Sequence, residues 1–121
     1  ASLILRLTRH GQGLALFTGD AERRSLRRLL ASGRDLRAQV LLAPHHGSDR
    51  SFLAAFYKAV QPELVLASCG FQNRYNYPGS RLRAWLARHG IPLLHTGEPG
   101  QIRVSWPWTG PMRVRAVRPG G

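Results

Sequence analysis

Two adjacent histidines at the end of an apolar run offer the clearest chemistry in this sequence. They lie in Pro44–Ser48 (PHHGS), which directly follows the apolar residues Val40–Ala43. Imidazole is the commonest metal ligand among side chains, and it titrates near neutral pH. Two such rings on a turn after a strand have no evident role in packing. The pattern predicts that at least one of His45 and His46 binds a metal or transfers a proton, while the other orients it through a hydrogen bond.

A carboxylate follows an earlier predicted strand in the same way. Asp20 closes the run Thr18–Asp20 (TGD), directly after the apolar residues Leu14–Phe17. The same position suits a helix cap, because a carboxylate can accept the free amide hydrogens of the first turn of the next helix. Both roles stay open, since one oxygen can face a metal while the other caps a helix. We predict a catalytic, metal-binding group made of Asp20, His45 and His46.

A polar loop with aromatic residues follows a third predicted strand. Asn73–Pro78 (NRYNYP) combines amides, an arginine and two tyrosines, and such groups contact phosphates and stack on bases. A well-packed surface loop would use the same residues, and the sequence does not separate the two interpretations. The candidate DNA-binding residues are Ser48, Asn73, Arg74, Tyr75 and Tyr77.

The other histidines and the late tryptophans carry weaker signals. His89 precedes a glycine at a predicted helix end, where a cation interacts favourably with the helix dipole, so its role is predicted to be structural. His10 lies in a predicted turn and is expected to face solvent. His95 follows a predicted strand, so it either reaches the edge of the sheet that carries Asp20 and the two histidines or has no part in the site. Trp106 and Trp108 are predicted to pack in the core or at a sheet edge rather than to stack on bases.

The elements that must position these residues alternate between strands and helices. The predicted order is a hairpin over residues 2–17 with its turn at 9–13, a helix ended by Gly33, a strand at 40–43, a helix from 52 to 60, a strand at 64–67, a helix from Pro78 or Ser80 to Gly90, a strand at 91–94, and two strands at 101–106 and 112–117. Such an order implies a sheet with helices on at least one face and functional sites at the carboxyl ends of its strands.

Size and charge limit the partners and the class of protein. The 121 residues fit one domain, which we assign to residues 1–118 with a frayed tail at 119–121. Eighteen basic and 6 acidic side chains give a net charge of +12. This charge attracts polyanions, nucleic acids foremost, although the arginine bias of a GC-rich genome would produce the same composition. No apolar stretch approaches the roughly 20 residues needed to span a bilayer.

Four motifs occur in a family-specific order along nearly the whole chain. They are Phe17–Glu22, Leu42–Ser48, Ser68–Gly70 with Asn73–Tyr75, and His95–Gly97 leading to Gly100–Ile102. In this order they resemble the C-terminal, metallo-β-lactamase-like domain of the ComEC family of bacterial DNA-uptake channel proteins. The resemblance implies an α/β fold, namely the C-terminal half of a metallo-β-lactamase-type αβ/βα sandwich, with a mixed sheet, about three helices and a C-terminal hairpin.

The resemblance also implies a reaction and a set of partners. Asp20 would be the carboxylate that bridges two divalent metal ions, zinc or manganese, with the histidine turn adding polar or ligand groups. Metal-bound water would then attack a DNA phosphodiester bond. The implied partners are DNA, the upstream half of the domain and the membrane channel of the parent. The domain would be a soluble part of a bacterial inner-membrane protein, on the periplasmic side.

Two departures from the family pattern limit what the chain can do alone. The His-x-His-x-Asp-His motif of the upstream half is absent, and the chain begins inside a strand-like run without Met, which suggests a piece of a longer protein or a mature segment. Tyr77 stands where the family commonly has histidine, and tyrosine, with a pKa of about 10, is a poor zinc ligand. We therefore expect this chain to hold no metal by itself, to be catalytically inert, and to self-associate through uncovered sheet surface. The alternative is a non-catalytic DNA-binding or structural module of the channel.

Overall fold

The computed structural model describes residues 4–68, 78–96 and 101–117. The predicted DNA-binding residues Asn73, Arg74, Tyr75 and Tyr77 lie outside this part of the chain. In chain order the elements are β1 (Leu5–Arg9), β2 (Gln12–Phe17), α1 (Arg23–Ala31), β3 (Val40–Leu42), the short 3-10 helices η1 (Pro44–Gly47) and η2 (Asp49–Ser51), α2 (Ala54–Val60), β4 (Leu64–Ala67), α3 (Ser80–Arg88), β5 (Leu93–His95), β6 (Gln101–Ser105) and β7 (Arg113–Val117).

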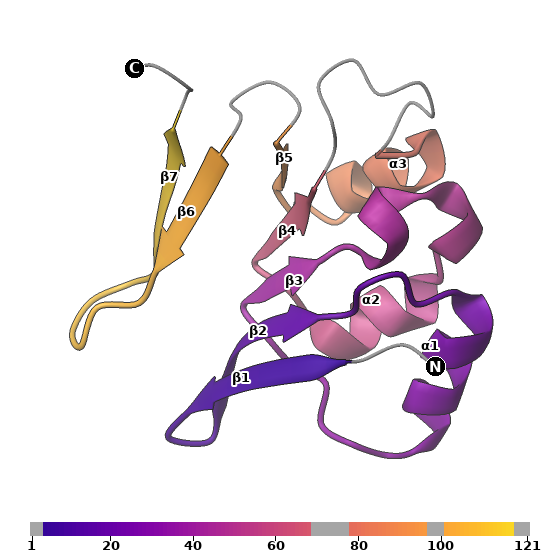
Figure 1. Ribbon diagram of the computed structural model, residues 1–121, viewed down its shortest axis with the longest axis horizontal. Helices are drawn as coiled ribbons and strands as arrows, with labels where there is room; N and C mark the ends of the chain where they lie inside the picture. The colour runs from indigo at the N-terminus through magenta and orange to yellow at the C-terminus, as the bar shows by residue number, and fades with distance from the viewer. Residues whose placement is uncertain (1–3, 69–77, 97–100, 118–121) are drawn as a thin grey trace.

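A five-stranded mixed sheet forms the centre of the fold. Its strands follow the order β1-β2-β3-β4-β5; β1 is antiparallel to β2, and the remaining neighbours are parallel. The three helices lie on one face of this sheet, and the antiparallel hairpin β6–β7 lies on the other side (Figure 1). The predicted α/β class, with a mixed sheet, three helices and a C-terminal hairpin, is thereby confirmed.

The first hairpin closes more tightly than the sequence predicted. Arg9 pairs with Gln12, so the turn consists of His10 and Gly11 alone. Both have positive φ, 52° and 79°, which is the backbone of the type I′ turn that matches the twist of two antiparallel strands. Gly13, expected in the turn, instead lies in β2, where a Cβ atom would collide with the backbone carbonyl of Arg37.

The main core lies between the sheet and the three helices. The central strands are continuous apolar runs because parallel strands are covered on both faces. The central strands and all three helices contribute large, almost fully buried side chains to this core. They include Leu16, Leu26, Leu41, Phe56, Tyr57, Val65, Leu82 and Leu86. Burial, with a further contribution from the charge of Asp49, raises the pKa of the Tyr57 phenol far above its usual value, so this ring stays neutral in the core.

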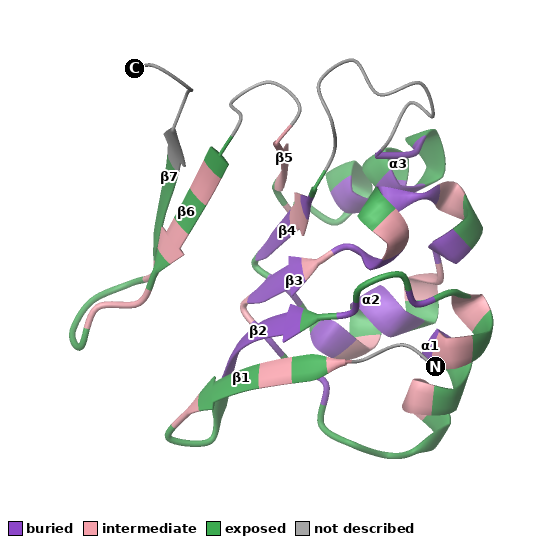
Figure 2. Cartoon of the chain, viewed as in Figure 1, coloured by how far each residue is buried: buried purple, intermediate pink, exposed green. Residues whose placement is uncertain are grey.

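The opposite face of the sheet is only partly covered. The strand register aligns five apolar side chains in one row across all five strands: Leu5, Phe17, Leu42, Leu66 and Leu94. Val104, Trp106 and Met112 of the hairpin region pack on part of this face. Leu5 and Phe17 nevertheless remain 55% and 39% exposed, and Figure 2 shows β1 as the exposed strand beside the buried β2–β4. An apolar surface is left open on the side away from the helices.

Of the two roles predicted for Asp20, the helix cap was wrong, because Asp20 does not cap the first helix. Helix α1 begins at Arg23, and its N-cap residue is Glu22, whose side chain makes no capping hydrogen bond. The cause is a local turn, in which Ala21 N donates to Thr18 O at 3.1 Å while Gly19 takes a positive φ of 54°. This turn leaves the Asp20 carboxylate outside the first turn of the helix.

One short segment joins two helices to the histidine turn. The carboxylate of Asp49 accepts hydrogen bonds from the backbone amides of Arg81 and Leu82, both at 3.1 Å, and so caps α3 from a distant part of the chain. The guanidinium of Arg23, in α1, donates to the carbonyls of Asp49 at 3.1 Å and Phe52 at 3.0 Å. Residues 49–52 therefore fix both helices relative to the turn.

Candidate metal centre

The candidate centre lies at the carboxyl edge of the parallel strands. Asp20 follows β2, His45 and His46 lie in η1 directly after β3, and Ser68 follows β4. Because β2, β3 and β4 run parallel, these three chain segments meet at one edge of the sheet. The structure thus brings together the predicted carboxylate and the predicted histidine turn.

Asp20 and His46 face each other across this edge. The Asp20 Oδ1 atom lies 3.8 Å from His46 Nε2. On the other side of the ring, His46 Nδ1 lies 2.7 Å from the backbone carbonyl oxygen of Ser68. A carbonyl can only accept, so in the neutral imidazole Nδ1 carries the proton and Nε2 turns its lone pair toward the carboxylate. Metal-ligating histidines are commonly oriented by such a carbonyl.

The two side chains share a small pocket. Its volume is about 120 Å³, and its lining residues are Gly19, Asp20, Leu42, Ala43, His46, Leu66 and Ser68. His45 does not line it, although its ring centroid lies 6.1 Å from that of His46. Of the two histidines that the sequence left undistinguished, His46 is the one placed to act together with Asp20.

The residues present suit part of a metal site. With metal–ligand bonds of about 2.0–2.1 Å, two donors on one tetrahedral zinc lie about 3.3 Å apart, close to the Asp20–His46 separation. Within the described ranges, no group of three or more histidine, cysteine, aspartate or glutamate side chains is arranged to hold a metal. Catalytic zinc sites use three protein ligands. The described part of the chain therefore offers two donors of a larger set.

The histidine turn has an unusual backbone. His45 (φ 50°, ψ 50°) and His46 (φ 58°, ψ 22°) are both left-handed, and Gly47 follows with φ 82°. Each such non-glycine residue costs about 1–3 kcal/mol and persists only where neighbours enforce it; strain of this kind clusters at functional sites. Here His45 N donates to Gly19 O at 2.9 Å, and Gly79 N donates to Gly47 O at 2.8 Å. Those two bonds tie the turn to the Asp20 loop and to α3.

Ser48 is occupied by the local structure. It is 3% exposed, and its hydroxyl accepts a hydrogen bond from Arg50 N at 3.2 Å, so it caps η2. A DNA contact by Ser48 stays a prediction, as do those of the four loop residues outside the described part. The structural role of His89 is confirmed, because its Nδ1 lies 2.8 Å from Trp85 O and its ring stacks on that indole at 3.9 Å.

Two supporting groups were missed by the sequence analysis. The Ser68 carbonyl orients His46, and the Gly19 carbonyl holds the turn. Backbone groups leave no mark in residue type, so only the parallel order of the strands could have indicated them. His95 also ends near this edge, since it pairs with Ala67 at the end of β5. Its Nδ1 is buried and has no hydrogen-bond partner in the described part of the chain.

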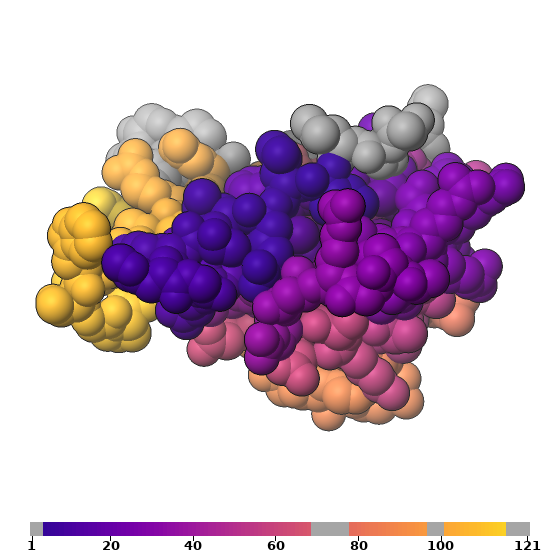
Figure 3. Space-filling model, turned by 90° about the horizontal axis from the view of Figure 1, so that it is seen from below, coloured from indigo at the N-terminus to yellow at the C-terminus, as the bar shows by residue number. Residues whose placement is uncertain are grey.

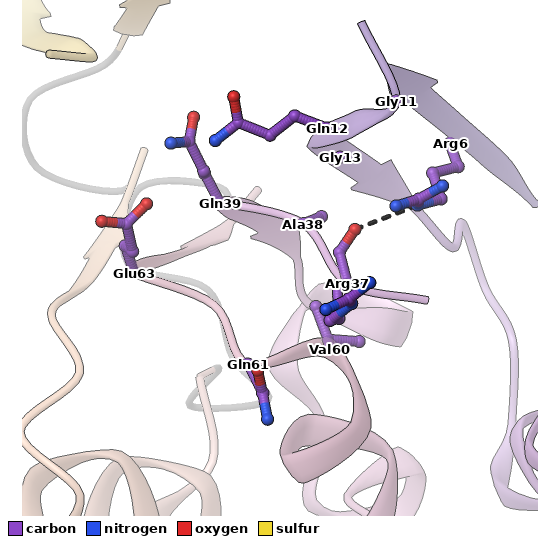
Figure 4. A pocket seen from close by; sticks show the side chains of 10 residues that line it. All are labelled: Arg6, Gly11, Gln12, Gly13, Arg37, Ala38, Gln39, Val60, Gln61 and Glu63. Carbon is purple, nitrogen blue, oxygen red and sulfur yellow. Dashed lines mark hydrogen bonds between the residues drawn. The ribbon is translucent and has the colours of Figure 1, made fainter. Parts of the chain in front are cut away.

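A second pocket lies at the amino ends of β3 and β4, away from the candidate centre. It measures about 330 Å³, and Arg6, Arg37, Gln39 and Glu63 are among its lining residues (Figure 4). Arg6 Nε donates to the carbonyl of Arg37 at 3.0 Å, and both guanidinium groups pair with Asp35, at 3.4 and 3.1 Å. The hydrogen bond from Arg37 lowers the pKa of Asp35 to about 2. Both guanidinium groups of this pocket therefore share one carboxylate partner, Asp35.

Comparison with known proteins shows similarity to a competence protein and to other bacterial proteins. The chain is 37% identical over 103 residues to the competence protein ComA of Neisseria gonorrhoeae, a match that covers 84% of this chain and 15% of that protein. It is 33% identical over 103 residues to the ComE operon protein 3 of Bacillus subtilis, covering 85% and 13%. Recombination protein 2 of Haemophilus influenzae is 31% identical over 99 residues, covering 79% and 12%.

These matches cover most of the chain but a small part of each relative. The chain spans only about one-seventh of the length of the first two. No family model matches the sequence, and no solved structure matches it. Among the described residues, no helix has both the length and the apolar character needed to cross a membrane.

Proposed function

We propose that this chain is the second half of a metallo-β-lactamase-like domain in a ComEC-type DNA-uptake protein, and that the complete domain hydrolyses DNA phosphodiester bonds. The observation that carries the proposal is the Asp20–His46 pair, 3.8 Å apart over a shared pocket at the carboxyl edge of the sheet. The names of two relatives, a competence protein and a recombination protein, and the net charge of +12 support a DNA partner. The proposed location is the periplasmic side of the inner membrane, beside the channel of the parent.

In this proposal, Asp20 and His46 Nε2 are donors to a divalent zinc or manganese ion. Such a metal lowers the pKa of its bound water and so supplies hydroxide near neutral pH. Ser68 holds His46 in the correct tautomer through its carbonyl, and the hydrogen bonds of Gly19 and Gly79 fix the turn. The remaining ligands come from polypeptide outside these 121 residues, so this chain alone does not cleave DNA.

The test is metal-dependent cleavage by a longer polypeptide that includes the residues preceding Ala1. We expect labelled single-stranded DNA to be cut in the presence of manganese or zinc, to be spared after chelation with EDTA, and to be cut again when metal is returned. The 121-residue chain, assayed beside it, should leave the DNA intact. Cleavage that survives EDTA and dialysis, or no cleavage with any divalent metal, would contradict the proposed activity.

A non-catalytic DNA-binding module is the second candidate. It is favoured by the presence of only two donors in the described part of the chain, set in a strongly basic protein. It requires binding of DNA that needs no metal and weakens steeply with salt. A purely structural partner of the channel would show no binding even at low salt. A binding titration in EDTA over a range of salt concentrations separates these two.

A half domain should associate with itself through its open sheet face. We expect multi-angle light scattering to show dimers or larger species, because Leu5 and Leu7 are 55% and 48% exposed on that face. Replacing both by lysine should shift the population toward monomer. The matched control places two lysines on the helix side, at the exposed positions Ala55 and Ala84, and should leave the association unchanged. A monomeric parent chain at all concentrations would contradict this expectation.

A further inference from the structure

The β6–β7 hairpin has one apolar face and one arginine-rich face. Ile102 and Val104 alternate with Arg103 and Ser105 along β6, and Val104 packs toward the sheet. Side chains of a strand alternate between its two faces, so Arg103 projects from the side away from the sheet. Across the ribbon, Arg103 pairs directly with Arg115, and Ser105 pairs with Arg113. Three exposed arginines therefore share the outer face of the ribbon.

In the part of the chain that the structure describes, no salt bridge balances this charge. Within the described ranges, the salt bridges of the protein involve Arg6, Arg37 and His46, and none reaches the hairpin. Like charges placed directly opposite each other on neighbouring strands are destabilising. The Arg103–Arg115 pair is such an arrangement, and a polyanion lying along the ribbon would remove its cost. The outer face thus has the charge pattern of a phosphate-binding surface.

The end of the hairpin presents an aromatic ring to solvent. Trp108 is 86% exposed, so its predicted packing role was wrong. The packing role of Trp106 is confirmed, because it packs against the sheet and its Nε1 donates a hydrogen bond of 2.7 Å to Gln39 Oε1. Alternation breaks down in the loop after Ser105, and this rotates the second indole outward.

Arg9 contacts both the hairpin loop and this exposed ring. Its guanidinium donates to the carbonyls of Trp106 at 3.1 Å and Pro107 at 3.3 Å, and it lies 5.8 Å from the centroid of the Trp108 ring. Seen from below, the hairpin forms one end of the molecule beside β1 and β2 (Figure 3). A ring that already contacts a neighbouring side chain loses less freedom when a flat partner stacks on it than an unsupported ring would.

We propose that the outer face of the hairpin, defined by Arg103, Arg113 and Arg115, binds single-stranded DNA together with the exposed Trp108 of the hairpin loop. Arginines along a groove or ribbon contact the phosphate backbone, and an exposed aromatic ring stacks on a base that is not paired. A membrane surface suits this face less well, because interfacial binding needs a broad apolar face. In the described part of the hairpin loop, Trp108 is the only large apolar side chain that is strongly exposed. The proposal rests on DNA as the partner of the domain, but not on the metal centre.

The test is the fluorescence anisotropy of a labelled oligothymidine with the 121-residue chain in EDTA. Replacing the three hairpin arginines by glutamine should weaken binding at least tenfold and should lower the salt slope by about 2, since each phosphate contact on a single strand contributes about 0.7. The matched control replaces the exposed Arg24, Arg27 and Arg28 of α1 by glutamine, which removes the same charge from another face. Its binding should stay within about threefold of the parent.

Trp108 supplies an independent arm of the same test. Trp108→Ala should weaken binding by roughly tenfold or more, and Trp108→Tyr should recover most of it, because stacking requires an aromatic ring and not the indole itself. Equal losses in the hairpin and α1 triple variants, or unchanged binding in Trp108→Ala, would overturn the proposal. Stronger binding to anionic vesicles than to oligothymidine would also overturn it. Because no metal is present, failure here leaves the cleavage test unaffected.

Discussion

Replacing Asp20 by asparagine is expected to reduce metal-dependent DNA cleavage by the longer polypeptide more than about 100-fold. Even groups that only support metal ligands are commonly worth 10- to 100-fold, and a bridging or direct carboxylate contributes more. Asparagine keeps the shape of the side chain but removes its charge. The Asp20 side chain is 77% exposed and caps no helix, so the free energy of unfolding should stay within about 0.5 kcal/mol of the parent.

Glu22 is the matched control for this change. It lies two residues farther along, is exposed, and makes no capping hydrogen bond, so Glu22→Gln removes the same charge close to the same place. Cleavage should remain within about twofold, because a solvent-exposed charge contributes little there. Equal rates for the two variants would show that Asp20 acts through general electrostatics or not at all, and the proposed metal centre would then be rejected.

The same assay separates the two histidines. Asparagine tolerates left-handed backbone better than most residues, so His45→Asn and His46→Asn preserve the turn while each removes one ring. The loss should be much larger for His46, which shares the pocket with Asp20.

The second large effect concerns stability rather than chemistry: Gly13→Ala should lower the free energy of unfolding by about 3 kcal/mol. A Cβ atom at this position would collide with the backbone carbonyl of Arg37, which cannot rotate away as a side chain can. The strand would have to move, and the hydrogen bond from Gln39 N to Gly13 O, 3.1 Å long, would be distorted. Overpacking of this kind costs about 1–3 kcal/mol and occasionally more.

Gly33→Ala provides the comparison for that substitution. Gly33 has a positive φ of 72° but open space around its Cβ position. Its cost should be only the strain of alanine in left-handed backbone, about 1–2 kcal/mol. Urea unfolding followed by circular dichroism measures both values. A smaller loss for Gly13→Ala than for Gly33→Ala would mean that the sheet relaxes around the added methyl group.

The order of the elements was predictable because each segment shows a clear period and a clear stop signal. The strand at 64–67 has the same bounds in the structure, and the C-terminal strands differ from their predicted bounds by one residue at an end. The edge that gathers Asp20 and the histidines followed from strand order as well. Elements buried on one face or both are the ones that residue patterns describe well.

The errors share a different cause. Capping was one of the two roles predicted for Asp20, and it failed because a glycine-centred turn that periodicity does not show separates Asp20 from the helix. Trp106 and Trp108 look alike in sequence, and only the loop geometry sends one inward and one outward. His45 and His46 also look alike in sequence, and only the geometry of their turn places His46, and not His45, at the pocket with Asp20. Where the chain leaves helix and strand, local hydrogen bonds decide side-chain direction.

The ties made by residues 49–52 affect how loss-of-function variants should be interpreted. Arg23 and Asp49 hold α1 and α3 against the histidine turn, and Gly79 leaves room for the Asp49 carboxylate, where a Cβ atom would collide. A random mutagenesis screen for lost activity would therefore return all three positions together with Asp20 and His46. The melting temperature of each variant would separate the two groups. It should fall for variants at positions 23, 49 and 79, which lose the contacts that hold α1 and α3, and should stay near that of the parent for variants at positions 20 and 46.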